Sequence, residues 1–266
     1  MLDSVLHQKL DQARFVLEEM LERFPLERTM LAWSAGKDST LVLYLLVELC
    51  RERGLRTPRV MDIDEKDPIP ELVSFRDRLV RDWKLDLLTI RNSDLLDKLD
   101  RIGDEVRVAD LNADNQSALA ALGVKEPSLR WVADSPACSL LFKTLPLRNA
   151  LRDHEIQALI TGIRWDEHPA RSQEIFFSPR ENPAHTRVQP ILHFTERDIW
   201  TATLALGIPY CPLYSQGYRS LSTRSSSKPS ADIPAWEQDL GSGDERGGRN
   251  REKESMMGQL RALGYM

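Results

Sequence analysis

The sequence contains few cysteines. Cys50, Cys138 and Cys211 are the only ones among 266 residues, and their wide separation gives neither a CxxC pair nor the spacing of metal ligands. A thiol-based zinc site or iron–sulfur cluster needs several cysteines within reach of one another. We therefore expect no disulfide framework, no structural zinc and no iron–sulfur cluster.

Long apolar runs are also missing. No stretch approaches the roughly 18 consecutive apolar residues of a membrane helix, and the first residues lack the basic start and apolar block of a secretory signal. The formal charge of −5 is the small difference between 41 acidic and 36 basic residues. We expect a cytoplasmic protein without a membrane partner or general nucleic-acid binding, whereas a homo-oligomer stays open.

Short apolar runs alternate with helical patterns along the chain. Strands are indicated at residues 30–33, 59–63, 85–90, 156–161 and 187–191, and helices at 4–24, 41–54, 71–83, 138–154 and 195–206. Strands that alternate with helices form right-handed crossovers, so this order predicts an α/β fold with a mainly parallel, doubly wound sheet. Residues 91–134 form an excursion, and Pro146 should kink or break its helix.

A loop of small residues, Ser34 to Ser39, joins the first strand to the second helix. Its main-chain N–H groups can approach an anion closely, and the helix N-terminus adds positive partial charge. Lys37 supplies a cation, while Asp38 can cap the helix or help to hold Mg²⁺. The candidate nucleotide-binding residues of the loop are Ser34, Ala35, Gly36, Lys37, Asp38, Ser39 and Thr40.

The loop fails the Walker pattern GxxxxGK[ST] twice. Leu31 stands in place of its first glycine, and Asp38 follows the lysine in place of Ser or Thr. A kinase or GTPase acting on the γ-phosphate is thus disfavoured. The loop resembles the SGGKDS loop of the ATP pyrophosphatases, with Ala35 in place of one glycine. Those enzymes split ATP between its α- and β-phosphates, so the resemblance implies ATP as a substrate and chemistry at the α-phosphate.

Further segments resemble one family. Asp64 with residues 70–77 is similar to "VDTG…PE…FRD", although Glu65-Lys66 replaces Thr-Gly, and residues 161–171 are similar to "G-x-R-x-D-E-x-x-x-R". Residues 188–200 and 208–214 are similar to "PL…T..DIW" and "IPYNPLY". These motifs resemble the family of phosphoadenosine phosphosulfate reductases and the sulfate adenylyltransferase small subunit, adenine nucleotide α-hydrolases that include FAD synthetase. The resemblance places Asp64 and Gly162 at the nucleotide.

Arg164 and Arg171 are candidate catalytic residues beside Lys37. Two guanidinium groups after a strand suit a doubly anionic group, because each can form bidentate bonds to phosphate or sulfate. The alternative is that both arginines pair with neighbouring carboxylates on the surface. His168 lies in the same loop and is an exposed histidine or a phosphate contact.

We divide the chain into an N-terminal helix (1–28), a nucleotide-binding α/β domain (29–212) and a C-terminal tail or lid (213–266). Residues 215–255 are poor in large aliphatic side chains and cannot bury much surface by themselves. They form a solvated appendage or a lid that orders over the nucleotide. The basic residues that could meet phosphates in a lid are Arg219, Arg224, Lys228, Arg246 and Arg249.

The resemblance leaves several activities open. A reductase needs a thiolate nucleophile, but no cysteine follows Cys211 and no histidine follows His193. An adenylyltransferase needs none, because an oxyanion attacks the α-phosphorus while Lys37, the two arginines and Mg²⁺ neutralise charge. Adenylylation of sulfate is the predicted function, with a GTPase as a possible partner. The alternatives are a reductase-related enzyme, an FAD synthetase-like or sulfur-transfer enzyme, a non-catalytic nucleotide-binding subunit and a scaffold without nucleotide.

Overall fold

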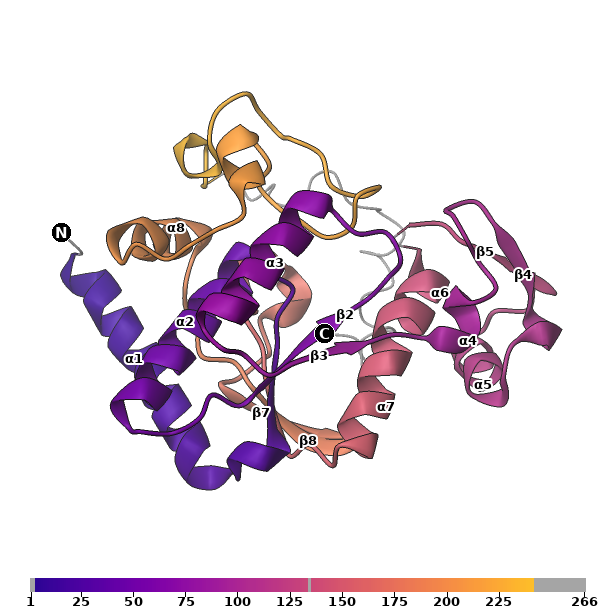
Figure 1. Ribbon diagram of the computed structural model, residues 1–266, viewed down its shortest axis with the longest axis horizontal. Coiled ribbons are helices and arrows are strands. Elements are labelled where there is room, and N and C mark those ends of the chain that lie inside the picture. The colour runs from indigo at the N-terminus through magenta and orange to yellow at the C-terminus, as the bar shows by residue number, and fades with distance from the viewer. Residues whose placement is uncertain (1–2, 134, 242–266) are drawn as a thin grey trace.

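The computed structural model describes residues 3–133 and 135–241 (Figure 1). Its longer helices are α1 (Ser4–Arg23), α2 (Lys37–Glu52), α3 (Pro70–Asp82), α5 (Ala113–Leu122), α7 (Leu145–Asp153) and α8 (Glu196–Ala205). Its strands are β1 (Thr29–Ala32), β2 (Arg59–Ile63), β3 (Leu87–Ile90), β4 (Glu105–Arg107), β5 (Ser128–Arg130), β6 (Ala158–Ile160), β7 (Phe177–Glu181) and β8 (Ala184–Val188). Short helical turns include α4 (Ser93–Leu96) and α6 (Pro136–Ser139).

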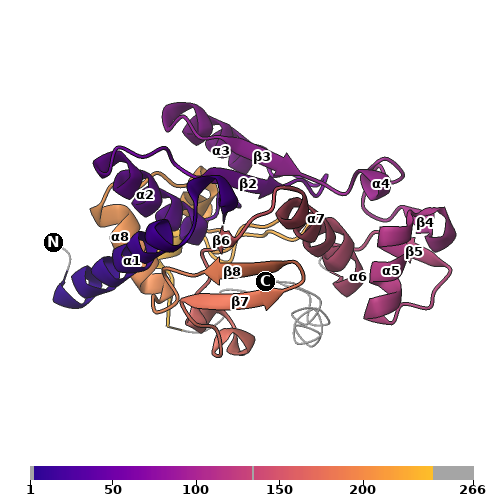
Figure 2. The ribbon, with the colours of Figure 1, turned by 90° about the horizontal axis from the view of Figure 1, so that it is seen from below.

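The main sheet has the order β3-β2-β1-β6-β8-β7. The first five strands are parallel, and β7 alone runs antiparallel, beside β8 at the edge (Figure 2). The chain therefore reverses its direction of winding at β1, between β2 on one side and β6 on the other. This confirms the predicted α/β fold with a mainly parallel sheet. It also brings the loops after β1, β2 and β6 to one edge, where open α/β sheets bind ligands.

Helices cover both faces of this sheet. Side chains alternate across a strand, so Leu31 of β1 packs with α1, α2, α3 and α8, whereas Met30 packs with α7 on the other face. Both side chains are at most 1% exposed. The runs of apolar residues in β1 and β6 follow from this burial on two sides.

The excursion predicted for residues 91–134 forms a small unit of its own. The antiparallel pair β4–β5 packs with α4 and α5 around buried side chains such as Leu95, Leu119 and Trp131. Figures 1 and 2 both show this unit beside α6 and α7, away from α1. The Lys66 ammonium, after β2, donates to the carbonyl oxygens of Leu96 and Leu99 and so ties the loop after β2 to the unit.

The helix around Pro146 departs from α-helical geometry just before the proline. Leu140–Thr144 is a π-helical segment between α6 and α7, and the Leu145 N–H donates to the Leu140 carbonyl. Proline lacks an N–H and disturbs the preceding turn, so a π-bulge takes the place of the expected break. Further along, Thr195 and Asp198 form a capping box at the start of α8.

The described part of the C-terminal segment, residues 213–241, packs against the domain. Leu221 and Ala235 are buried, and the Trp236 ring lies 5.4 Å from that of Trp200 in α8. The segment therefore buries more surface than its composition suggested, because its few apolar side chains pack against the main hydrophobic core. Residues 242–266 lie outside the described residues, and with them Arg246 and Arg249.

Candidate nucleotide site

The loop between β1 and α2 has the shape expected of a phosphate-binding turn. Ala35 has a φ of 56°, the left-handed region that favours glycine. Gly36 then serves as the N-cap of α2, without a capping side chain. A Cβ at Gly36 would lie 3.3 Å from the Ser34 hydroxyl. The turn thus needs small residues in order to bring its backbone close to the start of α2.

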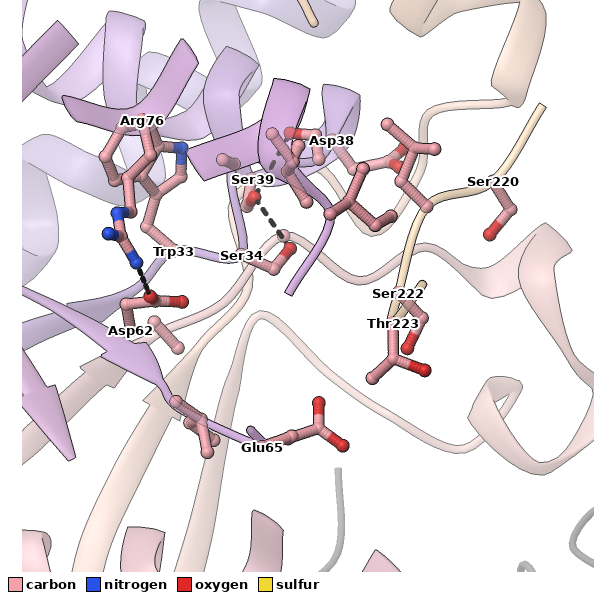
Figure 3. Close-up of a pocket in the computed structure, with 18 of the residues that line it drawn as sticks. Trp33, Ser34, Asp38, Ser39, Asp62, Glu65, Arg76, Ser220, Ser222 and Thr223 are labelled. Carbon is pink, nitrogen blue, oxygen red and sulfur yellow. Dashed lines mark hydrogen bonds and ion pairs between the residues drawn. The ribbon is translucent and has the colours of Figure 1, made fainter. Parts of the chain in front are cut away.

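A cavity of about 550 Å³ opens at this loop, where β1, β2 and β6 end. Figure 3 shows side chains from the loop, from the end of β2, from α3 and from the C-terminal segment around it. Ser220, Ser222 and Thr223 line the cavity from the C-terminal segment. Its volume lies in the range of small-molecule sites, about 300–1,000 Å³.

Lys37 lies in the wall of the cavity with its side chain 2% exposed. Its ammonium nitrogen is 3.3 Å from Asp38 Oδ2, 3.8 Å from Glu196 Oε1 and 3.3 Å from the Arg219 carbonyl oxygen. Its backbone N–H donates to the Tyr214 hydroxyl at 3.0 Å. The backbone N–H and the ammonium of Lys37 thus both donate to residues of the C-terminal segment.

The two predicted arginines have different positions. Arg164 is fully buried and does not line the cavity; it contacts Asp38 and donates to Asp166 Oδ1 at 2.8 Å. Arg171 does line the cavity, where its guanidinium contacts Glu167. Both arginines thus pair with neighbouring carboxylates, as in the alternative interpretation, but their guanidinium groups are buried and do not lie on the surface. Arg164 acts on the cavity through Asp38, whereas Arg171 faces it.

Of the three hydroxyl side chains in the loop, two line the cavity and one is buried behind it. Ser34 and Ser39 line the cavity with their Oγ atoms 3.4 Å apart, and Ser39 donates to the Gly36 carbonyl. Thr40 is buried behind them, where its Oγ1 accepts from the Trp33 indole at 3.0 Å. Thr40 therefore holds the first strand to α2.

Gly162 marks the closest approach between the end of β6 and α2. A Cβ on Gly162 would stand 2.8 Å from both the Cα and the backbone nitrogen of Ser39. Real Cβ atoms do not approach backbone so closely, so a side chain here would push α2 away. Gly162 serves to place the loop.

The end of β2 forms the other side of the cavity. Asp64 lines it, and its Oδ1 accepts from the Lys66 N–H at 2.8 Å. Glu65 Oε2 lies 3.1 Å from the Lys143 ammonium, which also donates to Ser222. Where the family motif has Thr-Gly, this chain thus has a carboxylate that lines the cavity, Glu65, and a lysine that contacts the unit of residues 91–134, Lys66.

Sequence reasoning did not identify Asp62, Arg76, Lys143 or Tyr214, all of which line the cavity. Burial raises the pKa of Asp62 although the Arg76 guanidinium opposes the shift, and Arg76 contacts Asp62 from α3. The "FRD" motif could have indicated Arg76. The "IPYNPLY" motif could likewise have indicated Tyr214, its last residue, whereas Lys143 comes from a distant segment without a local signal. His168 is half-buried and does not line the cavity.

Asp38 does not suit magnesium in this arrangement. Its Oδ1 contacts Arg164 and its Oδ2 lies 3.3 Å from Lys37, so both oxygens already face cations. Mg²⁺ needs carboxylate or phosphate oxygens that are available to it. Within residues 3–133 and 135–241, no group of three or more His, Cys, Asp or Glu side chains could hold a metal ion. The described residues therefore do not fit a protein-held magnesium at Asp38.

The fold and this loop define the class: an α/β protein with a turn of small residues before a helix N-terminus, at the carboxyl edge of its parallel sheet. Residues 28–229 match the model of the phosphoadenosine phosphosulfate reductase domain. The match covers more than half of the 266 residues, so the chain belongs to this family. In the part of the chain that the structure describes, helices that could cross a bilayer are absent.

Several enzymes are similar to the chain. A probable FAD synthase from Caenorhabditis elegans is 27% identical over 219 residues, which are 82% of this chain but 33% of that protein. Sulfate adenylyltransferase subunit 2 from Pseudomonas fluorescens is 26% identical over 246 residues, 83% of this chain and 70% of that one. Adenosine 5'-phosphosulfate reductase 1 from Bacillus subtilis is 36% identical over 91 residues, 34% of this chain and 38% of that one. The chain thus spans about a third of the FAD synthase.

Solved structures share the fold. Candida glabrata FMN adenylyltransferase, in complex with FMN and the ATP analogue AMPCPP, has a TM-score of 0.61 at 17% identity, covering 99% of this chain and 86% of that one. Phosphoadenylyl-sulfate reductase from Candida auris has a TM-score of 0.57 at 14% identity, covering 86% of this chain and 98% of that one. At these identities the likeness shows the fold alone.

Proposed function

We propose that the protein is an ATP-dependent adenylyltransferase and that sulfate is its acceptor. The observation that carries the proposal is the position of Lys37, a buried ammonium at the first turn of α2, in the wall of a cavity that also contains Arg171. A cation and a helix N-terminus together favour bound phosphate. The similarity to sulfate adenylyltransferase subunit 2, over most of both chains, supports sulfate.

The reaction needs charge neutralisation and alignment. A sulfate oxygen attacks the α-phosphorus of ATP, the bond from that phosphorus to the α,β-bridging oxygen breaks, and pyrophosphate leaves with the electron pair. Lys37 neutralises charge on the phosphates, Arg171 faces the same cavity, and Arg164 holds Asp38 in place beside Lys37. Preorganised cations of this kind stabilise the charge that develops in the transition state.

A reductase reaction has less support. Burial raises the pKa of Cys138 and of Cys211, and it raises the pKa of Cys50 to about 11. A thiolate nucleophile needs the opposite shift. All three thiols are buried. The cysteines are thus suited to packing.

Transfer of AMP to FMN is the second candidate. It is favoured by the similarity to the FAD synthase over 82% of this chain and by apolar side chains in the cavity, which an isoalloxazine ring could contact. The apolar side chains Ile69, Leu72 and Val73 line the part of the cavity beside α3.

An acceptor assay tests the proposal. Purified protein is incubated with Mg²⁺ and ATP labelled at the α-phosphate, together with sulfate, FMN or neither, with and without a GTPase subunit of a sulfate adenylyltransferase. We expect labelled adenylyl sulfate and pyrophosphate in the sulfate reaction. Formation of labelled FAD in the FMN reaction, without labelled adenylyl sulfate, would show that FMN is the acceptor and not sulfate. If the protein binds the nucleotide but releases no pyrophosphate under any of these conditions, the proposed enzymatic activity is contradicted, and the protein is a non-catalytic nucleotide-binding subunit.

A further inference from the structure

A chain of alternating charges runs behind the phosphate loop. Arg164 contacts Asp38, Asp38 lies beside Lys37, and the Lys37 ammonium is 3.8 Å from Glu196 Oε1. Glu196 in turn accepts from Arg219. Arg164, Lys37, Glu196 and Arg219 are each at most 7% exposed, so water screens these charges poorly. The position of one charge therefore depends on its neighbours.

The two oxygens of Glu196 have unequal surroundings. The Arg219 Nε donates to Oε2 at 2.8 Å, and a second guanidinium nitrogen lies 2.7 Å from the same oxygen. Oε1 is buried and, among the described residues, accepts no hydrogen bond. The Lys37 ammonium lies 3.8 Å from Oε1, beyond hydrogen-bond distance. Arg219 thus satisfies the carboxylate from the side opposite to Lys37.

Loss of the Arg219 side chain would change which cation pairs with Glu196. A buried carboxylate without its guanidinium is costly, and the Lys37 ammonium is close enough to Oε1, at 3.8 Å, to take the place of Arg219. Lys37 would then move from 3.8 Å into a direct ion pair with Glu196, and away from a phosphate in the cavity. The Arg219 carbonyl, which accepts from Lys37 Nζ at 3.3 Å, holds the ammonium on the other side.

We propose that Arg219 is a positioning residue: by neutralising Glu196 it keeps the Lys37 ammonium available to the nucleotide phosphates. Arg219 belongs to the C-terminal segment, whose next residues, 220–223, line the cavity. The segment is also fastened to the loop after β2, because the Ser225 N–H and hydroxyl donate to Asp67. Lys37 is therefore in its binding position when this segment is seated. The inference rests on the proposed function, since it requires phosphates at Lys37.

Binding of AMPCPP, measured by calorimetry on the full chain, tests this proposal without an acceptor. Arg219→Met should weaken binding by about tenfold or more, because Glu196 then competes for Lys37. Adding Glu196→Gln to that variant removes the competing charge and should restore binding to within about threefold of the wild type. A purely structural role predicts no such rescue, since the second substitution would add damage.

Arg180→Met is the matched control. Arg180 also donates two hydrogen bonds to a buried glutamate, Glu174, outside the cavity. We expect that variant to lose stability in urea without a change in AMPCPP affinity. If Arg219→Met does not fold, Arg219→Gln removes the charge but keeps a hydrogen-bond donor, and it should bind AMPCPP more weakly than the wild type, again with rescue by Glu196→Gln.

Two results would overturn the inference. Equal AMPCPP affinity in the wild type and in the Arg219 variants, or a double variant as weak as the single one, would contradict the role of Arg219 and leave the proposed function intact. A wild-type protein that binds no AMPCPP would contradict the proposed function as well.

Discussion

At the scale of single residues, the neighbours of Lys37 explain how its charged ammonium can be buried in the wall of the cavity. Asp38, Glu196 and the Arg219 carbonyl surround the ammonium. Such partners offset the cost of burying a charge. A phosphate that enters the cavity replaces some of them, so binding exchanges one set of charge contacts for another.

Sequence reasoning identified part of this set. Lys37, Ser34 and Ser39 follow directly from a loop between a strand and a helix, and all three line the cavity. Tyr214 is 177 residues from Lys37, and only the folded sheet brings them together. Lys143 and Glu65 are likewise far apart in the sequence and meet only in the folded protein. Local patterns predict what one turn can do, but not which distant side chains complete it.

Ala35→Gly should stabilise the protein. Ala35 has a left-handed φ of 56°, which costs a residue with a Cβ roughly 1–2 kcal/mol, whereas glycine adopts it freely but gains unfolded-state entropy. We expect a net gain of about 0.5–1 kcal/mol in the free energy of unfolding, measured in urea. Ala120→Gly, on the exposed side of α5, should instead lose about 1 kcal/mol. A loss at both positions would contradict the strain at Ala35.

At the scale of elements, burial decides which strands the sequence can reveal. The strands β1, β2, β3 and β6 were expected, because short apolar runs suit a sheet covered on both sides. The edge strand β7 was not predicted, because its sequence FSPRE is mostly polar and contains a proline. The strands β4 and β5 have three residues each and give no periodic signal.

The hydrogen bonds around Glu174, between η5 (Pro169–Arg171) and the β7–β8 hairpin, make a pH-dependent contribution to stability. Burial alone would raise the pKa of Glu174, but hydrogen bonds from Ser178, Arg180 and Gln189 lower it to about 2, against an ordinary 4.5. The folded pKa is depressed, so the stabilisation is complete above pH 4.5 and is lost as the pH falls towards 2. Its size is of the order of 3 kcal/mol.

Urea unfolding at pH 7 and near pH 2 measures this contribution. Glu174→Gln should destabilise the protein at pH 7, and the difference from the wild type should shrink towards pH 2. The control Glu19→Gln removes a carboxylate from an exposed pair on α1, with Arg23, and should change stability by less than about 1 kcal/mol at either pH. A Glu174→Gln effect that is the same at both pH values would contradict the assignment.

At the scale of the whole molecule, the sheet brings four separate segments to one cavity. The loop after β1, the loop after β2, the segment after β6 and the C-terminal residues 220–223 all line it. The loop pattern and the family resemblance indicated the first three, which lie together because parallel strands end at one edge. The excursion and the C-terminal segment pack through scattered side chains, so their positions could not be read from local patterns. We retain the division at residues 28 and 212 as a proposal.

The most direct test of the account is nucleotide binding at Lys37. Calorimetry with AMPCPP should show binding by the wild type, and Lys37→Ala should weaken it by between about tenfold and a hundredfold, the loss expected for a charge-assisted contact to phosphate. Lys9→Ala, which removes an ion-paired lysine outside the cavity, should leave the affinity unchanged. A wild type that does not bind AMPCPP, or a Lys37→Ala variant that binds it equally well, would contradict the central claim.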